Sequence, residues 1–175
     1  DHFKRFNDLH GHSGGDRVLA AIGELLLAQT RGEDICCRYG GEELTIILPE
    51  VDLPTACMMA EKLRAGIEAL QVMGDGVCLP KVTASFGAAS FPAHASTVAS
   101  LLQRADAALY RAKHEGRGNY RFFEPEMDAE ARRRRQMELD LHDAITEGQL
   151  SLMFQPLFDL SESRISAFEA LLRWH

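Results

Sequence analysis

Two adjacent carboxylates, Glu42 and Glu43, directly follow the pair Gly40-Gly41 in the stretch RYGGEEL. Short β-prone runs at 35–39 and 44–48 flank the glycines, which predicts a hairpin centred on Gly40-Gly41, because both turn positions need a positive φ. Mg²⁺ favours one or two carboxylates and takes its remaining ligands from water and substrate phosphates. The accessible tip is therefore a candidate metal site. A charged hairpin turn is also common on its own, so the tip needs partners elsewhere in the chain.

The composition is that of an ordinary globular protein. The 175 residues are 46% hydrophobic and 26% charged, which excludes a disordered or fibrous chain. The 19 basic and 26 acidic residues give a formal charge of −7, the wrong sign for a protein that coats nucleic acid. A phosphate-bearing ligand must then be met by local basic residues or by metal ions. We expect one domain and part of a second, without a membrane span, because Glu24 interrupts the most apolar stretch.

Cysteine, histidine and arginine patterns point to no further metal or polymer site. The four cysteines lack CxxC spacing and histidines in zinc-ligand register, which disfavours a zinc site or disulfide framework and indicates a reducing setting. His10 and His12 form an HxH pair, but no third ligand lies nearby in the sequence. The four arginines at 132–135 are a candidate nucleic-acid patch; the acidic residues on both sides favour a solvated linker face instead.

Hydrophobic periodicity predicts a chain of alternating helices and strands. Apolar residues at three- and four-residue intervals predict amphipathic helices at 16–29, 54–70 and 98–114. A Gly-rich turn is expected at 73–76, and strands at 82–89 and 119–123. The highly charged stretch 124–147 predicts an exposed helix, and strand-like runs return at 150–154, 157–158 and 165–172, where a second domain begins.

Four motifs share their order and spacing with one family. They read DHFKRFND at 1–8, GHSGGD at 11–16, GGEEL at 40–44 and RAKHEGRGN at 111–119. Together they resemble the GGDEF family of diguanylate cyclases over residues 1–124. The resemblance implies an α/β fold of the α+β sandwich, palm-like nucleotide-cyclase type, in which helices flank a central, mostly antiparallel sheet. In this family two facing domains each bring one GTP, and the two condense into cyclic di-GMP with release of pyrophosphate, which implies a homodimer for catalysis.

The resemblance also assigns roles to individual residues. Glu42 and Glu43 are implied to be the metal and catalytic carboxylates, with Mg²⁺ or Mn²⁺ as the cofactor. Asn7 and Asp16 are implied to read guanine, since a carboxylate accepts hydrogen bonds and an amide both donates and accepts. A turn Asn and a helix N-cap Asp are the structural alternative for these two. The contacts to the substrate phosphates are implied to come from Phe3, Lys4, Lys113 and Arg117.

A regulatory site is implied by the RxxD motif of Arg31 and Asp34, which five residues separate from Gly40. This is the spacing of the family's inhibitory site for the product, and Arg64 falls where a second arginine often completes it. A guanidinium can pair with the guanine edge or with phosphate in a bidentate manner. A surface ion pair is the alternative. Leu44 stands where the family commonly has Phe, an apolar replacement that we expect to preserve function.

The C-terminal motifs LMFQP at 152–156 and FEALLRW at 168–174 resemble the start of the EAL domain, a cyclic di-GMP phosphodiesterase with a TIM-like barrel. The resemblance implies a metal ligand at Glu169 and substrate contacts near Gln155 and Arg173. We therefore expect three parts: a GGDEF domain lacking its first strand, a helical linker, and an EAL fragment with the first barrel strands, at 1–124, 125–148 and 149–175.

We expect a diguanylate cyclase module in a bifunctional GGDEF–EAL signalling protein. The alternative is a GGDEF domain that senses GTP or cyclic di-GMP and regulates an EAL phosphodiesterase. The family takes another metal-binding Asp from two residues upstream of Asp1, and the barrel needs ~250 residues, so we expect the chain as given to be inactive in both directions. A cytoplasmic location is expected, with any membrane anchor of the parent outside this segment.

Overall fold

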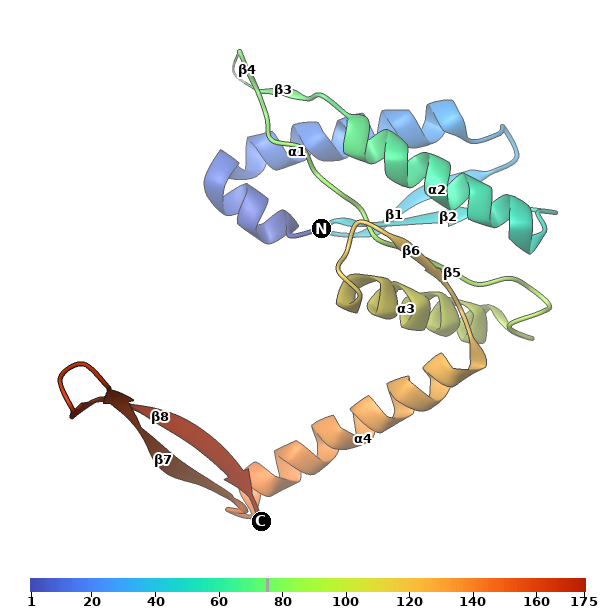
Figure 1. Ribbon diagram of the computed structural model, residues 1–175. Coiled ribbons are helices and arrows are strands. Elements are labelled where there is room, and N and C mark those ends of the chain that lie inside the picture. The colour runs from blue at the N-terminus through green and yellow to red at the C-terminus, as the bar shows by residue number, and fades with distance from the viewer. Residues whose placement is uncertain (75) are drawn as a thin grey trace. The chain divides into compact units, whose positions relative to one another are not determined.

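The computed structural model describes residues 1–74 and 76–175 (Figure 1). The chain divides into two compact units, Asp1–Asp128 and Ala129–His175, and each is described by itself. Among the described residues, no helix combines the length and apolar character that crossing a membrane requires.

The first unit begins with a long, kinked helix, α1 (Phe3–Gln29). The helix expected at 16–29 is confirmed, but the structure adds helical residues on both sides of a kink at Gly11, at 3–10 and 12–15. Gly11 breaks the helical path with φ 71° and ψ 163°, a positive-φ, extended conformation that is almost restricted to glycine. The kink allows Phe6, on the N-terminal segment, to join the same core as Val18 and Ile22.

The acidic tip lies on the predicted β-hairpin, in which β1 (Ile35–Gly40) pairs antiparallel with β2 (Glu43–Ile47). The turn is one residue later than expected, because Gly40 pairs with Glu43 after a register shift that follows Arg38. Gly41 and Glu42 therefore form the turn, and Gly41 has a φ of 46°. The Arg38 guanidinium stabilises it by donating to the Gly41 carbonyl at 2.7 Å.

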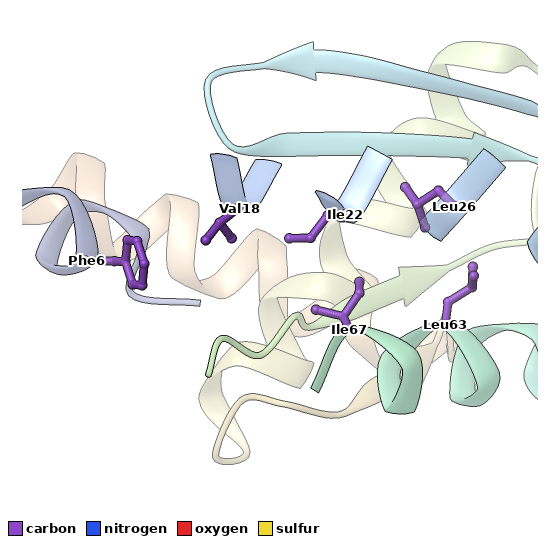
Figure 2. Packing of buried hydrophobic residues seen from close by; sticks show 6 residues of the cluster. All are labelled: Phe6, Val18, Ile22, Leu26, Leu63 and Ile67. Atoms are coloured by element: carbon purple, nitrogen blue, oxygen red, sulfur yellow. The ribbon is translucent and has the colours of Figure 1, made fainter. Parts of the chain in front are cut away.

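The helix expected at 54–70 is confirmed as α2 (Leu53–Ala69), which begins where the Asp52 side chain accepts a hydrogen bond from the Thr55 amide at 2.9 Å. Figure 2 shows Val18, Ile22 and Leu26 of α1 lying between the hairpin and α2, with Phe6 to one side; the core is formed by Phe6, Val18, Ile22, Leu26, Leu63 and Ile67. Leu44 of β2 packs against this core, so the hairpin is fixed to α1 next to the acidic tip.

The third helix, α3 (Val98–His114), has the predicted bounds, and Thr97 and Ser100 cap it reciprocally. It packs closely on β5 (Phe86–Ala88): a Cβ at Gly87 would lie 2.2 Å from the Ala105 carbonyl oxygen and from the Leu109 amide nitrogen. β5 pairs in parallel with β6 (Tyr120–Phe122). These contacts fix the basic end of α3 against the strands.

A long helix, α4 (Pro125–Thr146), follows, as predicted for 124–147. The second unit continues with β7 (Leu150–Asp159) and β8 (Arg164–Trp174), which pair antiparallel from Leu150 and Trp174 to Asp159 and Arg164. The strand-like runs after residue 149 are thereby confirmed as one hairpin. Whether this hairpin opens an EAL barrel stays a prediction.

The mixed α/β class is confirmed, but the prediction of a central, mostly antiparallel sheet is wrong for the described residues. Their strands form two-stranded sheets: β1–β2, β7–β8 and the short β3–β4 (Met73–Gly74 and Val77–Cys78) are antiparallel, and β5–β6 is parallel. The strand expected at 82–89 shrinks to β5, Phe86–Ala88. The expected turn at 73–76 includes residue 75, which lies outside the described residues.

Candidate active site

Acidic and basic groups from distant parts of the chain converge on Asp1. Burial lowers the pKa of its amino group, the Glu42 carboxylate acts in the opposite direction, and Lys113 and Arg117 lower this pKa further. The hairpin tip and the basic end of α3 therefore both lie within electrostatic range of Asp1. The structure thus brings three of the predicted motifs to one place.

The side chain of Asp1 organises the same region, a role that the sequence reasoning missed. Its carboxylate accepts hydrogen bonds from the Thr83 hydroxyl at 3.0 Å, the Ser85 hydroxyl at 2.7 Å and the Gly118 amide at 3.1 Å. All three donors lie more than eighty residues away along the chain. No local pattern could have revealed these partners.

Asp106 is a second acidic group that the sequence reasoning missed. Neighbouring protein that shields it from water raises the pKa of its carboxyl, the charge of Glu43 raises it further, and Lys113 lowers it. Asp106 and Lys113 are seven residues apart on α3 and so share a helix face. A carboxylate two turns before Lys113 was the available signal, and its charge coupling places Glu43 of the hairpin near this face.

The hairpin tip offers oxygen ligands that fit a hard divalent cation. Glu42 and Glu43 are both exposed, and Mg²⁺ needs only one or two carboxylates when water and phosphates complete its octahedron. Across residues 1–74 and 76–175, no cluster of three or more Asp, Glu, His or Cys side chains is arranged to hold a metal. The donor set therefore fits a cation that is shared with a substrate better than a closed structural site.

The predicted guanine readers lie on both sides of the α1 kink. Asn7 is half-buried, and its Oδ1 is buried without a hydrogen-bond partner among the described residues. Asp16 is exposed and lines an open cavity of ≈ 420 Å³ between α1 and the hairpin, with Leu26 and Leu44 among the other lining residues. Asn7 therefore has an unused acceptor, and Asp16 has free access to a ligand.

The predicted phosphate contacts differ in exposure. Lys4 and Arg117 are exposed, whereas Lys113 and Phe3 are half-buried. Phe3 stacks on Phe6 with 6.3 Å between ring centroids, which ties this segment to the core. The HxH pair does not act as a unit, because the His10 ring packs on Phe6 at 4.8 Å and His12 is exposed.

The two charged residues of the RxxD motif, Arg31 and Asp34, bind each other. Arg31 donates from its guanidinium to the Asp34 carboxylate at 2.9 Å and from its backbone amide at 2.7 Å, and it also reaches the Pro49 carbonyl at 3.1 Å. These hydrogen bonds lower the pKa of Asp34, so its carboxylate stays charged below its usual range. Nearby, the Lys62 ammonium donates to the Gln29 carbonyl at 3.3 Å.

Arg64 has other partners. Its guanidinium bonds both oxygens of Glu61, at 2.8 and 2.7 Å, and Glu68 at 2.7 Å. A further donor reaches the Gly118 carbonyl at 3.3 Å, next to Arg117. The structure therefore joins Arg64 to the turn after α3.

In the second unit, the register of β7 and β8 places Gln155 directly opposite Glu169. Arg173 lies four residues further along β8, on the same face as Glu169 because strand side chains alternate. All three side chains are exposed.

Comparison with known proteins gives a consistent result. The family described as "Diguanylate cyclase, GGDEF domain" matches residues 1–119. The bifunctional diguanylate cyclase/cyclic di-GMP phosphodiesterase MucR of Pseudomonas aeruginosa is 37% identical over 175 residues, which cover 99% of this chain and 25% of MucR. The chain spans about a quarter of the length of the curated relatives it matches.

Solved structures agree with this match. The GGDEF domain of YfiN from P. aeruginosa aligns with a TM-score of 0.71 and 34% identity, over 75% of this chain and 77% of that one. The GGDEF domain of DgcB from Caulobacter crescentus, in complex with c-di-GMP, aligns with a TM-score of 0.65 and 31% identity over 70% and 72% of the two chains.

The kinked helix, the acidic hairpin and the basic end of α3 define an α/β domain with a nucleotide-cyclase-like fold. Because the family match extends over most of the chain and includes all four motifs, the chain belongs to the GGDEF family of diguanylate cyclase domains.

Proposed function

We propose that this chain is a diguanylate cyclase module, which condenses two GTP molecules into cyclic di-GMP and releases pyrophosphate. The observation that carries the proposal is that Glu43 of the hairpin and Lys113 of α3 both act on the Asp106 carboxyl, while the Gly118 amide, next to Arg117, donates to the Asp1 carboxylate at 3.1 Å. A nucleoside triphosphate needs cations for its phosphates and carboxylates that hold a divalent ion, and this arrangement offers both kinds of group within one region.

Each group has a distinct task in this reaction. Glu42 and Glu43 would hold Mg²⁺ or Mn²⁺, which when bound neutralises triphosphate charge. Lys113 and Arg117, with Lys4 and the backbone near Phe3, bind the phosphates and orient the α-phosphorus toward the 3′-hydroxyl of the second GTP. Asn7 and Asp16 hold guanine, and the unpartnered Oδ1 of Asn7 supports this role. Because each domain binds one GTP, catalysis requires two copies that face each other.

Product control is a second part of the proposal. Asp34 is half-buried and holds the exposed Arg31 side chain, and a guanidinium held in this way can grip guanine or phosphate of cyclic di-GMP. The complex of the related DgcB domain with c-di-GMP supports binding of this ligand. Arg64 was expected to complete the site; its guanidinium donates to Glu61, Glu68 and the Gly118 carbonyl.

The second unit supports a wider context. Gln155, Glu169 and Arg173 share one strand face, as residues of an EAL substrate site would, and the relative MucR is a bifunctional cyclase and phosphodiesterase. We therefore also propose that the linker helix and hairpin lead into an EAL domain and that the protein acts in the cytoplasm. The competing function is a sensory GGDEF domain that regulates such a phosphodiesterase.

The test is a synthesis assay on the full-length protein with GTP and Mg²⁺, with products resolved by chromatography. We expect cyclic di-GMP from the wild type and none from Glu42→Gln or Glu43→Gln, with Tm within about 3 °C because exposed side chains contribute little packing. Glu24→Gln, an exposed carboxylate on α1, is the matched control and should synthesise normally. Normal synthesis by both tip variants would contradict the metal assignment, and cyclic di-GMP hydrolysis without synthesis would favour the sensory alternative.

A further inference from the structure

The turn after α3 contains three consecutive residues with positive φ: Gly116 at 108°, Arg117 at 61° and Gly118 at 57°. Glycine adopts this conformation freely, whereas a residue with a Cβ is disfavoured there. Such a conformation persists when surrounding contacts hold it, and it is characteristic of functional sites. The backbone of Arg117 therefore depends on its neighbours for its position.

Both polar groups of the Gly118 residue are held from outside the turn. Its amide donates to the Asp1 carboxylate at 3.1 Å, and its carbonyl accepts from the Arg64 guanidinium at 3.3 Å. The Asp1 carboxylate is itself fixed by the hydroxyls of Thr83 and Ser85. Gly118 is thus clamped between the start of the chain and α2.

Arg64 is well suited to be one side of this clamp. Its side chain is only 19% exposed, and Glu61 and Glu68 bind it from neighbouring turns of α2. These carboxylates compensate its charge within the chain and fix the plane of the guanidinium. Nη1, the nitrogen that binds Glu68, also donates to the Gly118 carbonyl, and the Arg64 side chain is less accessible to an external anion than that of Arg31, which is 47% exposed.

We propose that Arg64 is a positioning residue for the phosphate site: it holds Gly118 and thereby sets the place of the Arg117 guanidinium. The inference rests on the proposed cyclase function and deepens it, since it gives α2 a part in substrate binding. It also replaces the expected role of Arg64 in the product site with a different one.

The test compares Arg64→Ala with the wild type in the full-length protein. We expect the KM for GTP to rise about tenfold, as for other residues that orient a ligand-binding group, with less change in kcat. The affinity for cyclic di-GMP, measured by calorimetry, should stay within twofold. Arg134→Ala is the matched control, because it removes an arginine that pairs with Glu138 on α4 and should leave the KM unchanged.

Amide hydrogen exchange of residues 116–119 gives a readout that needs no activity. Exchange should accelerate in Arg64→Ala and not in Arg134→Ala. If the wild type makes no cyclic di-GMP, the proposed function fails, yet faster exchange in Arg64→Ala would still support the clamp. If Arg64→Ala does not fold, Arg64→Lys keeps a charge beside Glu61 and Glu68 without the forked donor and should show the same effects. Unchanged exchange, or lost cyclic di-GMP affinity with an unchanged KM, would overturn the inference.

Discussion

Adding a single methyl group at Gly15 should change both the packing of α1 and the binding of substrate. Gly15 lies inside α1 opposite the proposed guanine reader Asn7. A Cβ added there would lie 1.9 Å from Asn7 Oδ1 and 2.9 Å from the Phe3 ring, whereas a Cβ at Gly23 of the same helix would meet nothing within 4 Å. Gly15→Ala must therefore displace the Asn7 amide, and Gly23→Ala is a matched control for the change in helix propensity.

The magnitudes follow from two opposing effects. Alanine is favoured over glycine in a helix interior by about 1 kcal/mol, and Gly23→Ala should gain this in full. Overpacking costs roughly 1–3 kcal/mol, so Gly15→Ala should range from neutral to about 2 kcal/mol less stable than the wild type. With about 2–4 °C of Tm per kcal/mol for a chain of this size, Gly15→Ala should unfold roughly 2–12 °C below Gly23→Ala.

The functional readout is the KM for GTP. Loss of one or two neutral hydrogen bonds to guanine, at about 1 kcal/mol each, should raise it roughly 5- to 30-fold in Gly15→Ala. Gly23→Ala should bind GTP as the wild type does. Thermal unfolding and steady-state kinetics on the same preparations supply both quantities. The reasoning is refuted if Gly15→Ala stabilises the protein as much as Gly23→Ala and leaves the KM unchanged.

Two further predictions concern charged groups. Arg31→Ala and Asp34→Ala should each weaken cyclic di-GMP binding about tenfold in calorimetry, because each removes half of a charge-assisted pair. Unchanged affinity would mean that the pair has only a structural role, in which Arg31 also binds the Pro49 carbonyl. Asp106→Asn should raise the Tm at pH 7 by roughly 1–3 °C. The pKa of Asp106 in the folded protein lies above its ordinary value of 3.8, so the free-energy penalty of its charge is present above the folded-state pKa and vanishes below about pH 3.8. A Tm gain that persisted at pH 3 would contradict this assignment.

Local signals predicted the elements that local interactions define. The bounds of α3 follow from its apolar face and from the Thr97 and Ser100 cap, which lie three residues apart in the sequence. The hairpin is equally local, but its turn moved by one residue because of the bulge after Arg38, which depends on strand pairing. The early start of α1 depends on Phe6 reaching a core whose other members begin at Val18. The prediction of the sheet was wrong for a related reason: strand pairing is a long-range interaction, and β5 and β6 pair across thirty-four residues.

The candidate site shows the same division. Glu42, Glu43, Lys113 and Arg117 lie in motifs that the sequence displays directly. The roles of Asp1 and Arg64 could not be predicted, because both depend on Gly118 far along the chain. The helical spacing of Asp106 and Lys113 was visible in the sequence, but the contribution of Glu43 was not. A motif identifies the groups that touch a ligand, whereas the groups that hold them in place become visible only in three dimensions.

The basic end of α3 shows how stability and function share residues. Arg111, Lys113 and His114 lie in its last turn, where positive charge interacts favourably with the helix dipole whether or not a ligand is bound. Arg111 and Lys113 have different partners in the folded chain. Arg111 pairs with Glu115 and Glu124, at 2.9 Å each, and so serves the chain itself. Lys113 instead acts on Asp1 and Asp106, beside the acidic hairpin. A chain with a net charge of −7 can therefore present local cations to the proposed triphosphate substrate at a place where its own helix already favours them.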